Sequence, residues 1–330
     1  MINEAVQRLL NNEVVGIPTE TVYGLAGRID SDIALKKIFS TKKRPFFDPL
    51  IVHVASIDQA KTLVKAWPRS ADVLAKKFWP GPLTIVLEKN EMISDLITAG
   101  LESVGIRMPN HPLTLEIIKK LNIPVAAPSA NKFGKTSPTK AIHVQSEFQN
   151  ENVFVVDGGD CQVGLESTVL VLKENGQNVS YKILRLGMIS EKMICDTLLE
   201  NHFLVEAIAD FSDRLAPGNM QFHYMPKVPL ILLSDRLKIE EQLIEIKARF
   251  ATFDTTDKNF EFAIPKKIEN FAEVVLNPDP AIAARELYSK LRDTADDNLD
   301  FIYFVIRPNH QSIEFSPIMD KLKKASSFTL

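Results

Sequence analysis

The chain has 330 residues, of which 45% are hydrophobic and 25% charged, so it is long enough for more than one globular domain of ~100–200 residues. No apolar run approaches the ~18 residues that cross a membrane, and the N-terminus, Met1-Ile2-Asn3-Glu4, has no secretory leader, so we expect a cytoplasmic protein. Residues 1–200 carry 23 Lys and Arg against 22 Asp and Glu, and residues 201–330 carry 16 against 20, which gives +1 and −4. Neither part has the strongly basic balance of a dedicated nucleic-acid-binding protein.

Residues 1–201 alternate between helix and strand patterns. We expect helices at 4–11 and 32–39, one that runs from Ser56 to Val64 with Ser56 as its cap, and another capped by Thr139. Strands are expected at 14–17, 50–54, 83–87, 104–108, 124–127, 153–156, 168–172 and 182–186. Residues 78–82 form a loop, because two prolines flank a glycine. This pattern predicts an α/β or α+β domain built on an open, twisted sheet with helices.

Residues 202–229 contain three prolines and a glycine with little periodicity, and we interpret them as a linker. Strands are expected after it at 230–233, 249–253, 260–264 and 301–306, with helices at 236–249, 279–296 and within 312–326. This alternation predicts a small Rossmann-like α/β domain over residues 230–330. No GxGxxG run opens it, so dinucleotide binding has no support.

Lys42 and Arg44 form a short basic motif that Pro45 closes. A Lys-Lys-Arg run is often only a solvated helix end, but here an apolar strand resumes at residues 50–54 and anchors the loop. Two cations on an anchored loop can stabilise the charge of a phosphoryl group. Gly134-Lys135-Thr136 is not the end of a phosphate-binding P-loop, because Ser129 stands where that motif needs its first glycine.

Other polar residues stand next to predicted strands. Ser129 and Asn131 follow the strand at 124–127, where α/β sheets place ligands, although a plain turn explains them equally well. Arg107 can clamp a carboxylate with two parallel hydrogen bonds, or can be a surface ion pair. Thr21 can be an ordinary turn hydroxyl, and His53 a satisfied core histidine.

Taken together, these residues resemble the threonylcarbamoyl-AMP synthase family, the YrdC-like enzymes in their longer two-domain form. The matching segments, in chain order, are 18–25, 42–45, 49–53, 78–84, 104–109, 127–131, 166–168 and, in the linker, 216–226. The Lys-x-Arg and Ser-x-Asn signature of the family falls on Lys42, Arg44, Ser129 and Asn131. Each segment alone is a weak signal, but the ordered set is specific, whereas the last third of the chain matches in layout more than in motif.

The resemblance implies a YrdC-like twisted, open, mixed sheet followed by the Rossmann-like domain. It implies a nucleotidyltransferase that joins L-threonine, bicarbonate or CO2, and ATP into threonylcarbamoyl-AMP and pyrophosphate. The product serves threonylcarbamoyladenosine modification of tRNA, so the implied partners are these substrates and the downstream tRNA threonylcarbamoyl-transferase machinery. Mg²⁺ is expected to arrive on ATP with few protein ligands, and no protein-held metal site is expected.

The resemblance also implies roles for individual residues. Lys42 and Arg44 are the expected catalytic residues. The residues expected to bind threonine are Thr21, His53, Arg107, Ala127 through its backbone, and Ser167. The residues expected to face ATP are Lys42, Arg44, Asp48, Ser103, Ser129, Asn131, Ser137, Arg185 and Tyr224. Asp48 departs from the asparagine that the family usually has there.

The linker is too aromatic, at Phe222-His223-Tyr224, for a passive tether. We expect it to close as a lid over the N-terminal groove with His223 or Tyr224 near the nucleotide, because the carbamate and the mixed anhydride hydrolyse readily. An alternative class is an RNA-binding module that uses the same groove, and a weak RNA contact stays open. A carbamoyl-transfer maturation factor is a third reading, but Cys161 and Cys195 cannot supply its zinc fingers.

Overall fold

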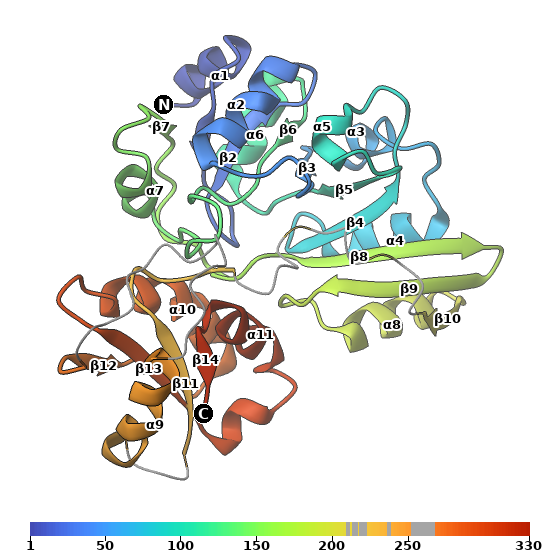
Figure 1. Ribbon diagram of the computed structural model, residues 1–330. Helices are drawn as coiled ribbons and strands as arrows, with labels where there is room; N and C mark the ends of the chain where they lie inside the picture. Colours follow the sequence, from blue (N-terminus) through green and yellow to red (C-terminus); the bar gives the residue numbers. More distant parts are fainter. Residues whose placement is uncertain (209–211, 213–216, 218–222, 236–238, 252–267) are drawn as a thin grey trace. The chain divides into compact units, whose positions relative to one another are not determined.

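The computed structural model describes residues 1–330 except 209–211, 213–216, 218–222, 236–238 and 252–267. The chain divides into two compact units (Figure 1). The first comprises Met1–Phe133 and Ser137–Asn219, and the second comprises Gly134–Thr136 and Met220–Leu330. The three residues 134–136 therefore belong to the second unit although they lie within the sequence of the first. No helix in the described ranges is long and apolar enough to cross a membrane.

The first unit is built on a ten-stranded mixed sheet in the order β10-β9-β8-β4-β5-β3-β6-β2-β1-β7. The strands are β1 (Val15–Ile17), β2 (Gly24–Arg28), β3 (Ile51–His53), β4 (Leu83–Glu88), β5 (Ser103–Arg107), β6 (Val125–Ala126), β7 (Phe154–Val155), β8 (Thr168–Asn175), β9 (Asn178–Arg185) and β10 (Leu204–Ala207). The helices are α1 (Ile2–Leu10), α2 (Asp32–Lys42), α3 (Ile57–Lys61), α4 (Arg69–Phe78), α5 (Asp95–Thr98), α6 (Pro112–Leu121), α7 (Ala141–Glu147) and α8 (Glu191–Glu200).

The two faces of this sheet bury different cores. Residues of α2, α4 and α8 pack with Val52, Ile85 and Ile106 in the larger cluster, whereas α1 and α6 pack with β1, β2 and β6 in a second cluster. Because side chains alternate along a strand, the neighbours of Val52 and Ile106 point to the face that α1 and α6 share. On that face the strands β3, β4, β8 and β9 contribute only a small cluster of five buried residues. This part of the sheet carries the polar residues described below.

Local sequence explains where the helices begin and end. The hydroxyls of Ser31, Ser56 and Ser190 accept hydrogen bonds from the first turns of α2, α3 and α8. At the other end of α2, Lys43 adopts the left-handed conformation (φ 52°) and ends the helix, so that the chain turns immediately before Arg44.

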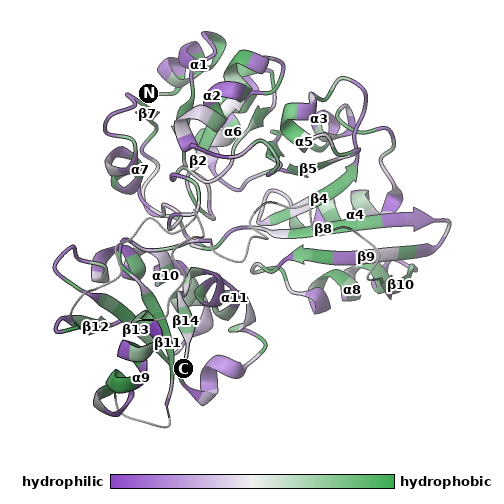
Figure 2. Cartoon of the chain, in the orientation of Figure 1, coloured by the Kyte–Doolittle hydropathy of each residue, from purple (hydrophilic) through white to green (hydrophobic). Residues whose placement is uncertain are grey.

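The second unit has a four-stranded parallel sheet in the order β12-β13-β11-β14. Its elements are β11 (Leu230–Ser234), α9 (Ile239–Ala251), β12 (Phe271–Glu273), α10 (Pro280–Thr294), β13 (Phe301–Ile306), the short 3₁₀ helix η2 (Pro308–Gln311), α11 (Ser316–Ala325) and β14 (Phe328–Thr329). Figure 2 shows β11 and β13 as mainly hydrophobic, whereas the far end of β8 in the first unit is hydrophilic. Continuous apolar runs are typical of parallel strands that are covered on both faces.

The structure confirms the expected fold class, a large mixed sheet followed by a small parallel α/β domain, and differs from the sequence expectations at three places. Helix α7 begins at Ala141 with Lys140, and not Thr139, at its N-cap position, and the carbonyl of Thr139 accepts a hydrogen bond from the backbone N–H of Cys161 (2.9 Å). Residues 249–251 continue α9, because Phe250 extends the helical spacing of Ile246 and packs against Phe301. The expected linker contains a strand, β10, which extends the first sheet beside β9.

The expected strand at 260–264 and much of the expected lid lie outside the described residues. The sequence patterns do not predict β2, α4, α5, α6, α8, β12 or β14.

Candidate active site

Most residues that we expect to bind ligands lie in the first unit, at strand ends or on the loops and the helix end beside them. His53 ends β3 and Arg107 ends β5, and the two stand opposite each other in the parallel register. Gly105, two residues before Arg107, has no side chain, and a Cβ there would lie 3.2 Å from the methyl carbon of Thr84 and 3.7 Å from Ile51. Ile51, Thr84, Gly105 and Arg107 therefore share one face, and the glycine leaves room on it.

Thr21 lies in the loop between β1 and β2 and is fully buried. The hydroxyl of Thr19 donates to the carbonyl of Val22 (2.6 Å), and the hydroxyls of Thr19 and Thr21 lie 2.8 Å apart. Because the proton of Thr19 is already used, Thr21 donates to Thr19 and keeps lone pairs for an incoming N–H group.

His53 is buried beside two arginines. Burial, together with the charges of Arg107 and Arg185, lowers its pKa to about 3, so the ring is neutral at physiological pH. Its Nδ1 lies 3.3 Å from the carbonyl oxygen of Ile51. That contact favours the tautomer with the proton on Nδ1, which leaves Nε2 as a hydrogen-bond acceptor. Thr21 and His53 thus both supply acceptors suited to an amine.

Arg107 is held on two sides. Its Nε donates to the carbonyl of Gly81 (3.2 Å), and its Nη2 lies 2.8 Å from Oε2 of Glu20. Gly81 is required at this turn, because a Cβ there would stand 2.3 Å from the carbonyl oxygen of Phe78. The guanidinium is therefore ion-paired, a contact that the sequence analysis did not anticipate.

Lys42 is the last residue of α2, and its side chain is 1% exposed. Its Nζ donates to the carbonyls of Ser129 (2.5 Å) and Asn131, so it holds the loop after β6 against the helix. Burial, and then the nearby charge of Arg44, bring the pKa of Lys42 well below its ordinary value. The Ser-x-Asn segment is thus brought to the basic motif through its backbone.

Arg44 is buried in the loop between α2 and β3. It pairs with Oδ2 of Asp48 (2.9 Å) and also donates to the carbonyls of Asp48 and Pro49 (3.2 and 2.8 Å). Burial raises the pKa of the Asp48 carboxyl, although Arg44 and Lys42 act in the opposite direction. The loop is therefore folded around its own arginine.

Ser167 lies where β8 begins, beside the end of β9. Arg185 donates from Nε to the carbonyl of Ser167 and from Nη2 to its hydroxyl, both at 3.0 Å. The Ser167 hydroxyl also lies 2.7 Å from that of Thr84. Ser137 donates to a carboxylate oxygen of Glu166 (2.6 Å). The charge of Arg185 acts to lower the pKa of both His53 and Asp48, so Arg185 influences the residues around β3 as well as the loop that precedes it.

Two of the expected nucleotide residues stand apart from these contacts. Ser103 starts β5 and lies four residue steps along the strand from Arg107, which is about 13 Å. Tyr224 belongs to the second unit, where its ring packs 4.1 Å from that of His223 and 5.6 Å from that of Tyr288. Ala127 lies beside β3, with its backbone N–H bonded to the carbonyl of Ile51 (3.1 Å).

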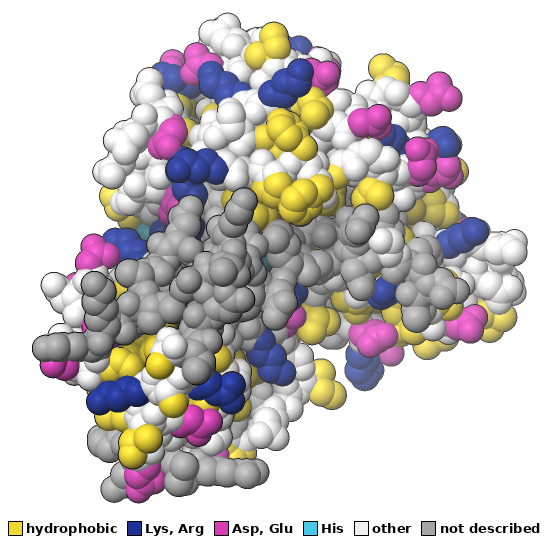
Figure 3. Space-filling view, viewed as in Figure 1, with side chains coloured by type: hydrophobic (Ala, Val, Ile, Leu, Met, Phe, Trp, Pro, Cys, Tyr) yellow, Lys and Arg dark blue, Asp and Glu magenta, His cyan; other side chains and the backbone are white. Residues whose placement is uncertain are grey.

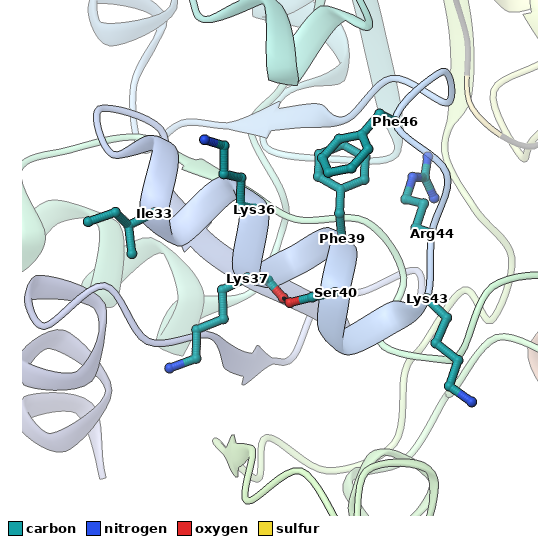
Figure 4. A pocket seen from close by; sticks show the side chains of 8 residues that line it. All are labelled: Ile33, Lys36, Lys37, Phe39, Ser40, Lys43, Arg44 and Phe46. Atoms are coloured by element: carbon teal, nitrogen blue, oxygen red, sulfur yellow. Dashed lines mark hydrogen bonds between the residues drawn. The ribbon is translucent and has the colours of Figure 1, made fainter.

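A hollow of about 600 Å³ lies on the outer side of α2. Figure 4 shows the ring of Phe46 against that of Phe39, with Arg44 on the adjoining loop and the side chain of Lys43 directed away from it. The full lining is Ile33, Lys36, Lys37, Phe39, Ser40, Lys43, Arg44 and Phe46. Figure 3 shows lysine, arginine and hydrophobic side chains intermingled on this side of the first unit. The hollow shares only Arg44 with the expected site, so we place the chemistry on the sheet face.

Comparisons with known proteins give the family. The family profile described as "Telomere recombination" matches residues 7–187, and the profile of the threonylcarbamoyl-AMP synthase C-terminal domain matches residues 189–327. Threonylcarbamoyl-AMP synthase of Bacillus subtilis is 41% identical over 246 residues, which cover 74% of this chain and 70% of that protein. The chain belongs to the threonylcarbamoyl-AMP synthase family.

Other members of the threonylcarbamoyl-AMP synthase family match over both units. The enzyme of Schizosaccharomyces pombe is 33% identical over 95% of this chain and 85% of its own length. The crystal structure of P. abyssi Sua5 complexed with L-threonine has a TM-score of 0.80 and 32% identity, and the match covers 100% of this chain and 96% of that one. The fold is therefore that of a two-domain member of the family.

Glu20 and Glu166 lie in the matching segments 18–25 and 166–168 and have no role in the sequence analysis, but the structure joins Glu20 to Arg107 and Glu166 to Ser137. Both carboxylates are 6% exposed. A charged residue between buried hydroxyls, as in Thr19-Glu20-Thr21, is the signal that could have pointed to Glu20, because ionised groups are rarely buried without a partner. Among the described residues there is no group of three or more His, Cys, Asp or Glu that could hold a metal ion.

Proposed function

We propose that this member of the family is an L-threonylcarbamoyladenylate synthase, a nucleotidyltransferase that forms threonylcarbamoyl-AMP and pyrophosphate from L-threonine, bicarbonate or CO2, and ATP. The observation that carries the proposal is the charge of the site. Four cationic side chains, Lys42, Arg44, Arg107 and Arg185, are at least nine-tenths buried in the first unit. Three buried carboxylates, Asp48, Glu20 and Glu166, accompany them. Buried cations in excess favour an anionic ligand.

The lowered pKa of Lys42 supports a polyanionic ligand. In the free protein, burial and Arg44 disfavour its charged form. A triphosphate supplies negative charge next to an ammonium that burial has deprived of solvating water, so nucleotide binding stabilises the charged form of Lys42. In this proposal Lys42 and Arg44 act on the phosphates, with Ser129, Asn131, Ser137, Ser103 and Arg185 as further nucleotide contacts.

The amino-acid part of the proposal rests on complementary groups. Arg107 takes the carboxylate of threonine, and the acceptors of His53 and Thr21 suit its amine or hydroxyl. Ser167 and the backbone at Ala127 complete this side. The crystal structure of P. abyssi Sua5 complexed with L-threonine supports the choice of amino acid.

The reaction depends on positioning and electrostatic stabilisation more than on covalent catalysis. The deprotonated amine of threonine adds to CO2 and forms an N–C bond, with one proton lost to solvent. A carbamate oxygen then attacks the α-phosphorus of ATP, the bond from this phosphorus to the bridging oxygen breaks, and pyrophosphate leaves. Fixed cations at Lys42 and Arg44 stabilise the charge that develops on the phosphates. We take Mg²⁺ to be part of the ATP substrate, since it usually needs few protein ligands.

The product is a mixed anhydride, so a transfer reaction must consume it promptly. We propose that the downstream partner is the tRNA threonylcarbamoyl-transferase machinery, and that the protein acts in the cytoplasm. The test is pyrophosphate release from ATP by the full chain, with threonine and bicarbonate each left out in turn. We expect release to need both, and equal release without threonine would reject the assignment.

A further inference from the structure

Glu20 is the buried acidic residue of the loop between β1 and β2. Both of its side-chain contacts use Oε2, which lies 2.8 Å from Nη2 of Arg107 and accepts a hydrogen bond from the backbone N–H of Asn110 (3.0 Å). Oε1 is buried and has no hydrogen-bond partner among the described residues. The carbonyl of Glu20 accepts from the N–H of Val163 (2.7 Å), so the main chain is fixed as well.

An ion pair in this position is a poor device for stability. The cost of removing two charges from water roughly cancels their attraction, and apolar residues of similar volume often stabilise a protein as well or better. The unfilled Oε1 adds a further cost of about 1–3 kcal/mol. A charged residue at this position is therefore better explained by its effect on Arg107 than by a contribution to folding.

The contacts of Arg107 show what that effect is. The guanidinium is planar and offers five donors in fixed directions. Nε donates to the carbonyl of Gly81, and Nη2 is ion-paired with the Glu20 carboxylate at 2.8 Å without a hydrogen bond among the described residues, so the guanidinium is held at two of its nitrogens. Within the described part of the chain, no hydrogen bond to Nη1 is found. The orientation of the free Nη1 edge is thereby determined before any ligand arrives.

We propose that Glu20 is a positioning residue that aligns the Arg107 guanidinium for the carboxylate of the amino-acid substrate. This inference rests on the proposed function, because it takes Arg107 as the carboxylate-binding group. Glu20 also compensates the charge of Arg107 while the site is empty. Without Glu20, only the hydrogen bond from Nε to Gly81 holds the guanidinium among the described residues, and ligand binding then carries a larger entropic cost of ordering it.

The test uses the full chain and initial rates of pyrophosphate release, with threonine and ATP titrated separately. We expect Glu20→Ala to raise the apparent Michaelis constant for threonine (the threonine constant) at least tenfold. The apparent Michaelis constant for ATP (the ATP constant) should rise less than threefold. Glu20→Gln keeps an acceptor for Arg107 and for Asn110, and we expect a rise of about threefold in the threonine constant. If Glu20→Ala does not fold, Glu20→Gln takes its place in the cycle below.

The decisive measurement is a double-mutant cycle with Arg107→Ala. If Glu20 acts through Arg107, then Glu20→Ala adds less than twofold to the threonine constant once Arg107 is gone. The proposal is overturned if the effects of Glu20→Ala and Arg107→Ala on the threonine constant multiply in the double variant. It is also overturned if Glu20→Ala raises the ATP constant as much as the threonine constant, or leaves the threonine constant unchanged. A wild-type protein that needs no threonine would instead reject the proposed function, so the two failures are distinguishable.

Thr114→Val is a matched control for loosening the same loop. The hydroxyl of Thr114 donates to the carbonyl of Pro18 (2.5 Å) and is fully buried, but no contact joins it to Arg107 among the described residues. We expect this variant to leave the threonine constant within twofold of the wild type. A rise as large as that of Glu20→Ala would assign the effect to loop anchoring and overturn the positioning role.

Discussion

The first unit contains two buried arginine–carboxylate pairs that are built in different ways. Arg44 pairs with Asp48, four residues away on the same loop, and also binds two carbonyls of that loop. Arg107, at the end of β5, pairs with Glu20, which lies in the loop between β1 and β2 and is far from Arg107 in the sequence. The first pair folds a loop around its cation, whereas the second joins two distant segments at a strand end. A change in the first should disturb the nucleotide side, and a change in the second the amino-acid side.

Removal of Arg44 is expected to give the largest effect. Arg44→Ala should lower turnover at least ~100-fold, about 2.7 kcal/mol, in line with the loss of one preorganised electrostatic group. The measurement is pyrophosphate release at saturating substrates, with circular dichroism to verify folding. Lys43→Gln is the matched control, because the neighbouring lysine is exposed, and it should retain nearly full activity. Activity of Arg44→Ala within threefold of wild type would remove Arg44 from the site.

Removal of Arg107 tests the other pair. Arg107→Ala should raise the apparent threonine constant ~30-fold, about 2 kcal/mol for a lost hydrogen bond to a charged group, and should leave the ATP constant within threefold. Separate titrations of the two substrates measure this split. A selective loss of ATP affinity would mean that the two sides of the site are assigned the wrong way round.

His53, which lies next to Arg107, should make the free energy of unfolding depend on pH. Its pKa is about 3 in the folded protein, against ~6.5 in an unfolded chain, so the unfolded chain binds the proton first as the pH falls. Its contribution is unchanged above pH 6.5 and is lost as the pH falls from 6.5 toward 3, by about 1.4 kcal/mol at pH 5.5. We therefore expect His53→Gln to flatten the decline in unfolding free energy between pH 7 and 5.5, measured with urea. An identical slope in the variant would show that His53 is not held neutral.

The smallest effect is expected for Asp48→Asn, which restores the residue usual in the family. Burial raises the pKa of Asp48, so its ionised form is disfavoured in the folded protein, and the uncharged amide should stabilise the fold at pH 7. Turnover should stay within threefold, because Arg44 keeps its two carbonyl contacts. A loss of activity as large as that of Arg44→Ala would show that the ion pair itself is needed.

The difference between the two ion pairs also explains which parts of the site could be predicted from the sequence. The Lys42–Arg44 motif, Asp48 and the strand at β3 lie within about a dozen residues, so their proximity was visible from the order of residues. The Glu20–Arg107 pair depends on how the loop after β1 crosses the sheet, which no local pattern specifies. Likewise Lys140, and not Thr139, stands at the N-cap position of α7, while the backbone carbonyl of Thr139 accepts a hydrogen bond from the distant residue Cys161. Residues 249–251 are helical, and Phe250 packs on Phe301. Local helix and strand propensities do not predict an element boundary where tertiary contacts determine it.

The short segment Gly134–Thr136 has a consequence for anyone who wants to separate the two units. Within the second unit, Thr136 and Gly134 exchange backbone hydrogen bonds with Met225 (3.0 and 2.8 Å), and Arg292 donates to the carbonyl of Thr136. The second unit is therefore discontinuous in the gene, and no single cut releases both units whole. A fragment that ends near residue 200 keeps three residues whose strand partner has been removed, and the complementary fragment lacks them. Recombination between relatives would preserve these pairings only if it exchanged both stretches together.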